Sequence, residues 1–492
     1  MKRKLFSLVL LFTGLSLTQG ICKTTAGSES ERAARGVIER TLGYVPKNLV
    51  LEVTGRDSVG RDYFSTEVSQ GRLIVRGSTP VAVCRGFYDY VKENGYGLVT
   101  WSMNTIRLPR RLPDQPLRTE VSPFRHRYYM NTCTFGYTHP YKKWSDWERE
   151  LDWMALHGFD MPLAPIGSEA IFARVWRSLG LTDEEIGDFV PGPAHLPWFR
   201  MGNMSRLDGP LTQAYYDETL ALQHRIVDRM NELGMTPIYN AFAGFVPESI
   251  RRIYPDVELF KTGWGDGEYY VSHFISPETE LFRTIAARYI REWEREFGKC
   301  KYYLADSFNE MKVPFAKRGT AERYEQIASY GDAIYESIHA VNPDAVWVLQ
   351  GWMFGYQRYI WDPESIEALF SRLPDEKVLL LDLSVDFNYG IWRNEYTWNY
   401  APKLYGKHWV YSTVPNFGGR TCPIGDVDFY LNGHLRALNS PNRGNLVGLG
   451  TAPEGVENNE VLYEAIGDAA WSEREIPVEE WLCHYSSLRY GS

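Results

Sequence analysis

From about residue 125 onward, eight short apolar runs alternate with amphipathic helical patterns. This alternation restricts the fold most strongly, because strands that alternate with helices form a parallel sheet. The runs are almost continuously apolar, which is typical of strands covered on both faces. They occupy residues 127–135, 159–167, 235–244, 300–310, 345–352, 377–386, 408–419 and 446–455. One of the helical patterns between them spans residues 144–157. Eight such units predict a (β/α)8 barrel with insertions.

A doubly wound open sheet is the main alternative to the barrel. Such a sheet usually carries a glycine-rich phosphate-binding turn directly after its first strand. Here the run at 127–135 is followed only by Gly136 and Tyr137. The sequence therefore favours the barrel over the open sheet.

A smaller α/β domain is expected ahead of the barrel, over residues 28–115. It contains two stretches with helical spacing and two strand-like runs, at residues 31–41, 81–93, 49–54 and 72–76. The proline-punctuated stretch at 108–116 predicts a domain boundary. We therefore predict the α/β class, with a small N-terminal α/β domain followed by a (β/α)8 TIM-like barrel over residues 120–457.

Residues 1–20 have the pattern of a secretory signal peptide. Basic residues follow the first methionine, and an apolar run at 5–17 leads to small or polar residues. We therefore expect export, to the periplasm or the extracellular space. A lipid anchor at Cys22 is the alternative, but Ile21 stands where lipidation requires a small residue. No second run of about 18 apolar residues follows, so no membrane span is predicted.

The composition excludes several classes of protein. The formal net charge is −9, whereas binding to nucleic acid or to an anionic membrane requires a basic surface. Aromatic residues make up 14% of the chain, and this share suits a protein that stacks rings on apolar or sugar faces. The cysteines are sparse and irregularly spaced, so at most one or two disulfides are expected.

Carboxyl groups stand at the ends of two predicted strands. Glu310 closes the run at 300–310, and Glu454 lies between Pro453 and Gly455 at the end of the last run. Two carboxyl groups are what cleavage of a glycosidic bond needs, one as acid and one as nucleophile or base. Spacing alone leaves Asp306 as an alternative to Glu310, and Glu457 and Glu460 as alternatives to Glu454.

Polar and aromatic side chains gather at other predicted strand ends and in the long loops. Barrel enzymes place their functional groups at these ends. We therefore select as candidates Asn131, Cys133, Tyr137, Glu169, Gln350, Trp352, Asp382, Asp386, Asn416, Phe417, Trp198 and Trp264. The glycine-rich stretch 263–267 is interpreted as a substrate-lining loop. The sequence has no zinc-binding His-Glu-x-x-His pattern, no Gly-x-Ser-x-Gly elbow and no Gly-x-x-x-x-Gly-Lys loop.

Several long motifs resemble glycoside hydrolase family 89, the α-N-acetylglucosaminidases. They occur in the family's order and include WERELDWMALHGFDMPLA at 147–164, GMTPIYNAFAGFVPE at 234–248, DSFNEM at 306–311 and GTAPEGVENNEV at 450–461. The resemblance covers nearly everything from the small N-terminal domain to Trp471.

The resemblance implies a retaining exo-hydrolase that removes terminal α-linked N-acetylglucosamine from mucin-type or heparan-type glycans, without metal or cofactor. It assigns Glu310 as general acid/base and Glu454 as nucleophile. The positions that match its sugar contacts are Asn131, Cys133, Tyr137, Trp198, Trp264, Asn309, Trp352 and Phe417, with Leu383 beside them. In an α-linkage the acetamido group lies on the side of the leaving group, so the protein must supply the nucleophile.

The resemblance also implies a large helical domain after the position of Trp471. This chain ends at Ser492, so we expect residues 458–492 to be the start of a truncated C-terminal helical domain. Two other functions remain open at this point. One is a catalytically silent glycan-binding protein, and the other is a different barrel exo-glycosidase that acts on unacetylated sugars.

Overall fold

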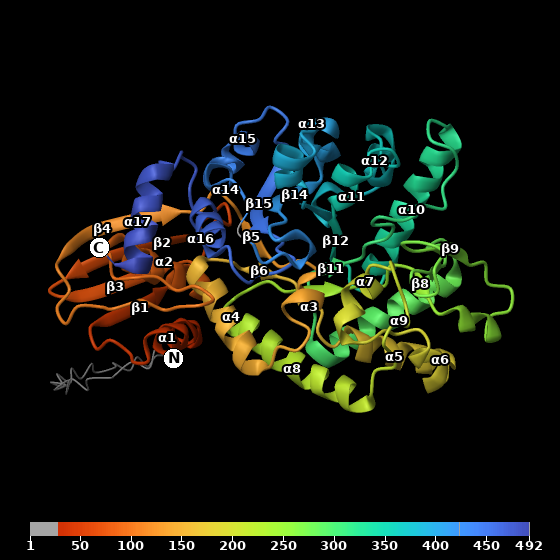
Figure 1. Ribbon diagram of the computed structural model, residues 1–492, viewed down its shortest axis with the longest axis horizontal. Helices are drawn as coiled ribbons and strands as arrows, with labels where there is room; N and C mark the ends of the chain where they lie inside the picture. The colour runs from red at the N-terminus through yellow and green to blue at the C-terminus, as the bar shows by residue number, and fades with distance from the viewer. Residues whose placement is uncertain (1–27, 423, 492) are drawn as a thin grey trace, which may run out of the picture.

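The computed structural model describes residues 28–422 and 424–491, and the predicted signal peptide at 1–20 lies outside these residues. A four-stranded sheet and its helices form one end of the molecule, and a barrel of parallel strands forms the remainder (Figure 1). The predicted fold class, a small α/β unit followed by a (β/α)8 barrel, is therefore confirmed.

The barrel consists of eight strands, each overlapping one of the predicted runs. They are β5 (His126–Tyr129), β6 (Met161–Pro162), β7 (Ile238–Asn240), β11 (Tyr302–Leu304), β12 (Val346–Gln350), β13 (Val378–Asp382), β14 (His408–Thr413) and β15 (Asn445–Thr451). All neighbouring pairs are parallel, in the order β6-β5-β15-β14-β13-β12-β11-β7. A parallel bridge from Leu163 to Ile238 links the two outer strands and nearly closes the barrel.

Most strands are shorter than the apolar runs that predict them. β5 ends at Tyr129, and the short helix α3 (Thr134–Tyr137) occupies the end of the same run. Likewise β11 ends at Leu304, although the run continues to residue 310. The excess residues leave the sheet at its C-terminal edge, where Phe135 is buried in the short helix α3 and Phe308 in a loop.

Helices after the strands form the outer layer of the barrel (Figure 1). The principal ones are α4 (Trp144–His157), α5 (Ser168–Leu179), α8 (Gln213–Glu232), α9 (Glu280–Phe297), α10 (Ala321–His339), α12 (Pro363–Phe370), α14 (Val427–Asn432) and α16 (Glu460–Ala469). α4 has the predicted bounds, and it ends where Gly158 adopts φ 81°. A left-handed residue at this position terminates a helix, and glycine adopts it without strain.

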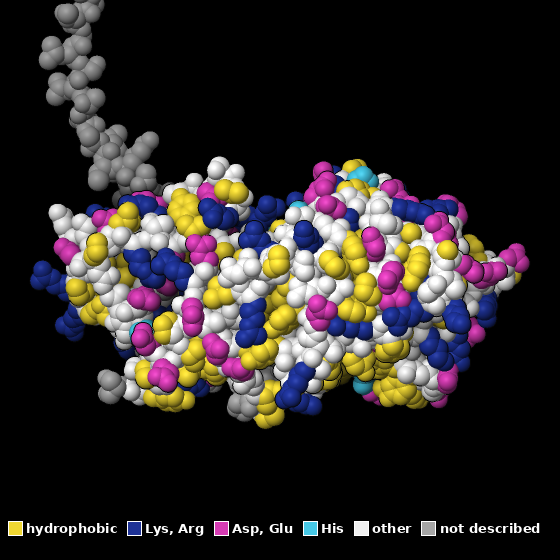
Figure 2. Space-filling view, turned by 90° about the horizontal axis from the view of Figure 1, so that it is seen from above, with side chains coloured by type: hydrophobic (Ala, Val, Ile, Leu, Met, Phe, Trp, Pro, Cys, Tyr) yellow, Lys and Arg dark blue, Asp and Glu magenta, His cyan; other side chains and the backbone are white. Residues whose placement is uncertain are grey.

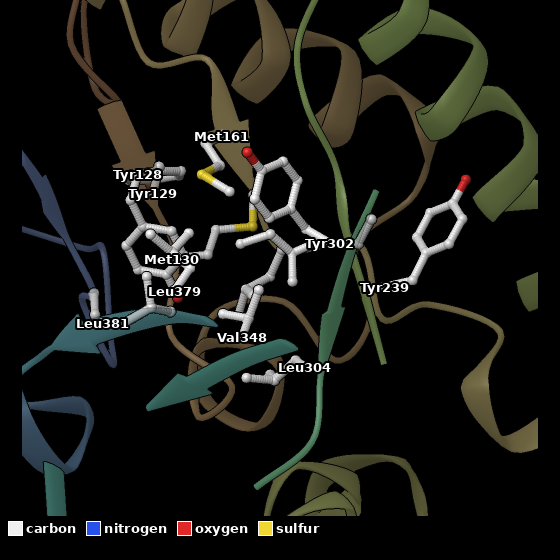
Figure 3. Close-up of a cluster of buried hydrophobic side chains, with 14 of the residues drawn as sticks. Tyr128, Tyr129, Met130, Met161, Tyr239, Tyr302, Leu304, Val348, Leu379 and Leu381 are labelled. Carbon is white, nitrogen blue, oxygen red and sulfur yellow. The ribbon is translucent and has the colours of Figure 1, made fainter. Parts of the chain in front are cut away.

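The interior of the barrel is filled with large side chains. Figure 3 shows part of this core, with Tyr128, Met130, Met161, Tyr302, Val348 and Leu379 pointing toward one another. These side chains are at most 7% exposed. The barrel is therefore a packed core, and a ligand can enter only at its ends.

The N-terminal unit contains both predicted helices and both predicted strands, together with two strands that were not predicted. Its elements are α1 (Glu29–Leu42), β1 (Leu49–Val53), β2 (Tyr63–Ser69), β3 (Arg72–Gly77), α2 (Pro80–Glu93) and β4 (Gln115–Val121). The sheet order is β1-β3-β2-β4. β4 begins within the proline-punctuated stretch and carries the sheet to residue 121, beyond the expected bound at 115. It was not predicted because it is a mostly polar edge strand.

Charged side chains join the N-terminal unit to the barrel. Lys92 of α2 contacts Glu464 at 2.6 Å and Asp468 at 2.5 Å, both on α16. Arg85 contacts Asp468 at 2.8 Å. The last helix, α17 (Val478–Tyr490), lies beside the N-terminal sheet (Figure 1). Burial of this cluster fixes the N-terminal unit on the outer face of α16.

Surface charge and cysteine pairing are the remaining global features. Figure 2 shows Lys and Arg side chains interspersed with Asp and Glu over the face that it displays. The five described cysteines are all free, so the one or two disulfides that the sequence allowed are absent among the described residues.

No helix within 28–422 and 424–491 combines the length and apolar character needed to cross a lipid bilayer.

Candidate active site

One cavity of about 220 Å³ opens at the C-terminal ends of the barrel strands. It brings together both proposed acids and most of the other residues selected from the sequence, namely Glu310, Glu454, Asn131, Cys133, Tyr137, Trp198, Trp264, Asn309, Gln350, Trp352, Leu383 and Phe417. Four other strand-end candidates do not line it, because their side chains bond elsewhere in the barrel: Glu169, Asp382, Asp386 and Asn416. Met201, Asn203, Val414 and Gly418 complete the lining. Residues from all parts of the barrel thus converge on a single space.

The backbone that follows β11 holds Glu310 in an unusual conformation. Phe308 and Glu310 have φ values of 65° and 57°, in the left-handed region that non-glycine residues rarely adopt. Phe308 is fully buried, and the Glu310 N–H donates to the Gln357 side chain at 2.7 Å. These two anchors hold the strained turn in place and direct the Glu310 side chain into the cavity.

The environment of Glu310 raises its pKa above the ordinary value of a glutamate. Burial is the main cause, because it disfavours the charged form. The indole N–H of Trp352 donates to Glu310 Oε1 at 2.8 Å and opposes this rise. Glu310 therefore keeps its proton to a higher pH than an exposed glutamate does, while one of its oxygens stays fixed in position.

Glu454 follows β15 and faces the same cavity. Its carboxyl group accepts a hydrogen bond from the Gly418 N–H, and the Cys133 thiol also donates to it. Burial nevertheless raises the pKa of Glu454 to about 7, and the charge of Glu310 adds to this rise. Since the two carboxyl groups repel each other, they titrate as a coupled pair.

The loop after β14 supplies the Gly418 donor. Asn416 and Gly418 have φ values of 55° and 68°, and these left-handed residues turn the Gly418 N–H toward Glu454. Asn416 also donates to the Gly455 carbonyl at 2.9 Å. This bond ties the Gly418 loop to the segment that carries Glu454.

The alternative acids Asp306, Glu457 and Glu460 do not line this cavity. Asp306 accepts from the Gln350 N–H at 2.8 Å. Glu457 accepts from the Thr138 hydroxyl at 2.7 Å, and Glu460 from the Ser102 N–H at 2.8 Å. Each of the three acids is therefore engaged in a hydrogen bond elsewhere, and Glu310 and Glu454 remain as the pair in the cavity.

Aromatic rings form two walls of the cavity. On one side Trp352 stacks on Phe417, with ring centroids 5.7 Å apart. On the other side Trp198 lies between Tyr137 at 5.4 Å and Trp264 at 6.1 Å. Tyr137 and Trp264 are 41% and 40% exposed, so this second wall extends to the rim. Rings in such positions can cover the apolar faces of a sugar.

Trp264 reaches the cavity from a small antiparallel sheet outside the barrel. This sheet contains β8 (Phe245–Val246), β9 (Phe260–Thr262) and β10 (Ser272–Phe274), in the order β8-β10-β9. The glycine-rich stretch 263–267 connects β9 to β10. The loop predicted to line a substrate site therefore does line the cavity.

Amide groups provide the polar part of the cavity. Asn131 accepts from the Cys133 N–H at 2.9 Å and donates to the Ala452 carbonyl at 3.1 Å. Asn203 donates to the Asn309 carbonyl at 2.8 Å. The side-chain oxygens of Asn203 and Asn309 are buried and have no hydrogen-bond partner among the described residues. These two acceptors are available to hydroxyl or amide groups of a ligand.

Four lining residues were not selected from the sequence: Met201, Asn203, Val414 and Gly418. Gly418 acts through its backbone N–H, which leaves no signal in residue type. Asn203 lies in a long loop, and neither a strand end nor a sugar contact implied by the resemblance pointed to it. Among residues 28–422 and 424–491, no group of three or more His, Cys, Asp and Glu side chains is placed to hold a metal ion.

The packed barrel, the ring-lined cavity at its C-terminal end and the paired carboxyl groups define the class of protein, a barrel of the glycoside hydrolase type. The family model for the α-N-acetylglucosaminidase (NAGLU) TIM-barrel domain matches residues 127–473, and that for the NAGLU N-terminal domain matches residues 32–114. The chain therefore belongs to the α-N-acetylglucosaminidase family, as the resemblance implied.

Individual relatives agree with this assignment. The human α-N-acetylglucosaminidase is 38% identical over 477 residues, which cover 95% of this chain and 62% of the human protein. A family 89 glycoside hydrolase from Clostridium perfringens, solved with PUGNAc, has a TM-score of 0.83 at 24% identity. CpGH89 from the same organism, solved with its substrate GlcNAc-α-1,4-galactose, has a TM-score of 0.82 at 24% identity. The structural likeness establishes the fold.

The matches cover different shares of the relatives. The two Clostridium perfringens structures are matched over 94% of this chain but over only 51% and 50% of their own chains. The chain thus spans about half of these structures and less than two thirds of the human protein.

Proposed function

We propose that the chain hydrolyses terminal α-linked N-acetylglucosamine from glycans as a retaining exo-glycosidase. The observation that carries this proposal is the pairing of Glu310 and Glu454 in one ring-lined cavity. The charge of Glu310 raises the pKa of Glu454, which supports their close approach, and retaining glycosidases need carboxyl groups about 5–5.5 Å apart. The human relative, named as an α-N-acetylglucosaminidase, supports the choice of sugar.

In the first step, Glu454 attacks the anomeric carbon as a carboxylate. The bond from this carbon to the glycosidic oxygen breaks, and Glu310 gives its proton to that oxygen, so that the aglycone leaves as an alcohol. The hydrogen bonds from Gly418 and Cys133 hold Glu454 in position for attack. The acetamido group of an α-linked sugar lies on the leaving-group side, so it cannot replace Glu454.

In the second step, water releases the sugar from Glu454. Glu310 is now a carboxylate and removes a proton from water, and the resulting hydroxide attacks the anomeric carbon. The bond to Glu454 breaks and both carboxyl groups return to their starting states. Trp352 keeps one Glu310 oxygen fixed at 2.8 Å through both proton transfers.

Substitution of the two carboxyl groups tests the proposal. We expect wild-type protein to release the chromophore from an aryl α-N-acetylglucosaminide, and Glu310→Gln and Glu454→Gln each to lower kcat by roughly 10³-fold or more. Glu457→Gln is the matched control, since Glu457 follows the same strand but does not line the cavity. Release that survives both substitutions would overturn the assignment.

Two other outcomes would identify the alternatives. Calorimetric binding of the saccharide without any turnover would indicate a glycan-binding protein. Equal activity on the unacetylated α-glucoside would indicate a different barrel exo-glycosidase, because the 2-acetamido group would then not be recognised.

We also propose that the protein is exported and meets its glycan outside the cytoplasm. The basic and apolar pattern of residues 1–20 supports this localisation. Secretion assayed with and without residues 1–20 tests it.

A further inference from the structure

The peptide group that joins Asn309 to Glu310 is bound at both ends by side chains from two other loops. Its carbonyl, which belongs to Asn309, accepts a hydrogen bond from Asn203 Nδ2 at 2.8 Å. Its N–H, which belongs to Glu310, donates to Gln357 Oε1 at 2.7 Å. Two side-chain amides thus hold a single plane of the backbone, directly before the residue that we propose as the acid.

The two amides bind this peptide group from opposite sides. The group is trans, and the carbonyl and N–H of a trans peptide point in opposite directions. Asn203 and Gln357 are each only 1% exposed, so the surrounding side chains restrict their movement. Rotation of the peptide plane would break both hydrogen bonds at once and leave their buried polar atoms without partners, which costs free energy.

The backbone conformation of Glu310 needs such a restraint. Its φ of 57° is in the left-handed region, which is unfavourable for residues that carry a Cβ. Rotation of the peptide plane by about 180° would give Glu310 a negative φ, which such residues prefer. The side chain would then leave in another direction and lose the hydrogen bond that it accepts from Trp352 Nε1 at 2.8 Å.

Asn203 also connects the acid to the second ring wall. Its N–H donates to the Trp198 carbonyl at 2.8 Å, and its own carbonyl accepts from the Trp264 N–H at 3.0 Å. Both tryptophan side chains line the cavity. One residue therefore fixes the turn that carries Glu310 relative to the two rings that face the sugar.

We propose that Asn203 and Gln357 are positioning residues, which act on catalysis by holding the peptide group before Glu310. Their amides keep this group in the orientation that directs the Glu310 carboxyl group at the glycosidic oxygen. Gln357 does not line the cavity, so its effect on the reaction passes through Glu310. The inference rests on the proposed function, since it assumes that Glu310 protonates that oxygen.

The dependence of the rate on the leaving group distinguishes a misplaced acid from a damaged site. Phenol is weakly acidic and needs a proton as it leaves, whereas 2,4-dinitrophenol leaves readily as an anion, so only the phenyl glycoside depends strongly on the acid. Gln357→Met removes the accepting oxygen with little change in side-chain length. We expect this variant to lower kcat/KM about 30- to 100-fold for the phenyl α-N-acetylglucosaminide and less than about threefold for the 2,4-dinitrophenyl one.

Three further variants assign the effect to the two amides. Asn203→Leu removes the donor at the other end of the peptide group and should produce the same selective loss. Gln357→Glu keeps an accepting oxygen, so it should lose less activity on the phenyl glycoside than Gln357→Met does. Gln223→Met is the matched control, because Gln223 is fully buried and donates to the Ala164 carbonyl at 2.7 Å, and neither residue lines the cavity. It should lower stability but leave the ratio of the two rates unchanged.

Crystal structures of Gln357→Met and Asn203→Leu test the inference without relying on turnover. We expect a rotated peptide group, a negative φ at Glu310 and loss of its hydrogen bond to Trp352. An unchanged peptide group and an unchanged bond to Trp352 in both variants would overturn the inference, and so would equal losses on the two glycosides. Failure of the proposed function is recognised separately, because the wild-type protein would then hydrolyse neither glycoside, and the crystal structures would decide the inference alone.

Discussion

Two sets of opposing influences act on the single residue Glu454. Burial and the charge of Glu310 favour its neutral form, whereas the Gly418 N–H and the Cys133 thiol favour the ionised form. The balance raises its pKa to about 7. A nucleophile must be ionised to attack, so the site holds Glu454 in a state that costs stability at neutral and alkaline pH.

This cost predicts a pH-dependent effect of Glu454→Gln on stability. The folded-state pKa, about 7, exceeds the ordinary value of 4.5, so the folded protein binds the proton more tightly than the unfolded chain. The resulting stability is present below about pH 4.5 and is lost as pH rises through 7. A glutamine retains the neutral form, so at pH 8 the variant should exceed wild type by roughly 1–3 kcal/mol in free energy of unfolding.

Urea denaturation at pH 8 and at pH 4.5 measures this difference. The gain should shrink toward zero at pH 4.5, and Glu457→Gln should change the free energy of unfolding by less than about 0.5 kcal/mol at both pH values. A Glu454→Gln variant that is no more stable than wild type at pH 8 would show that the ionised carboxyl group does not destabilise the folded protein.

At the scale of elements, the loops after the strands form the site. The loop after β14 turns through Gly418 and Gly419, and the latter has φ 66°. A Cβ added at Gly419 would lie 2.4 Å from the Tyr137 ring, which is far inside the van der Waals distance. The close approach of this loop to α3 therefore requires glycine, and it positions both Tyr137 and the Gly418 donor.

Gly419→Ala should therefore lower catalytic activity more than it lowers the stability of the fold. The added methyl group displaces Tyr137 and strains a left-handed residue, so we expect roughly tenfold lower kcat/KM for the aryl substrate and about 1–3 kcal/mol lower stability. Gly390→Ala is the control, because a Cβ there meets no atom within 4 Å. Unchanged kcat/KM in Gly419→Ala would argue against the proposed role of this contact.

Elements also show what the sequence can predict. The apolar runs predicted all eight barrel strands, because strands buried on both faces are apolar along their length. The helical spacing of apolar residues predicted the bounds of α4. The ends of β5 and β11 were not predicted, because apolar loop residues such as Phe308 continue the run after the strand has left the sheet. β4 was missed because an exposed edge strand lacks a hydrophobic signal.

The sequence predicted those parts of the site whose chemistry belongs to side chains. Glu310 and Glu454 were selected by strand-end position and by resemblance, but only the structure shows that Asp306 lies outside the cavity lining and accepts a hydrogen bond from Gln350. The role of Gly418 was not predictable, since a backbone N–H depends on the local φ angle rather than on residue type.

At the scale of the whole molecule, buried charges connect the N-terminal unit to the barrel. Lys92 lies between Glu464 and Asp468, and His157 of α4 contacts Glu464 at 2.8 Å. These groups are nearly inaccessible to solvent. Removal of one partner leaves the others charged and unpaired in a buried interface, which is more costly than loss of an exposed ion pair.

Lys92→Met should therefore destabilise the protein by about 3–5 kcal/mol in urea denaturation. Arg372→Met provides the comparison, because it breaks the exposed pair with Glu325 and should cost about 0–1 kcal/mol. Equal effects of the two substitutions would indicate that the buried cluster does not stabilise the junction between the N-terminal unit and the barrel.

If Glu454 attacks the anomeric carbon and Glu310 supplies the proton, the released sugar retains its anomeric configuration. Proton NMR during hydrolysis of an aryl α-N-acetylglucosaminide measures this configuration directly, because the anomeric signals of the product can be recorded before mutarotation mixes the two anomers. We predict that the α-anomer of N-acetylglucosamine appears first and the β-anomer follows slowly. Initial appearance of the β-anomer would mean inversion and would contradict the assignment of Glu454 as nucleophile.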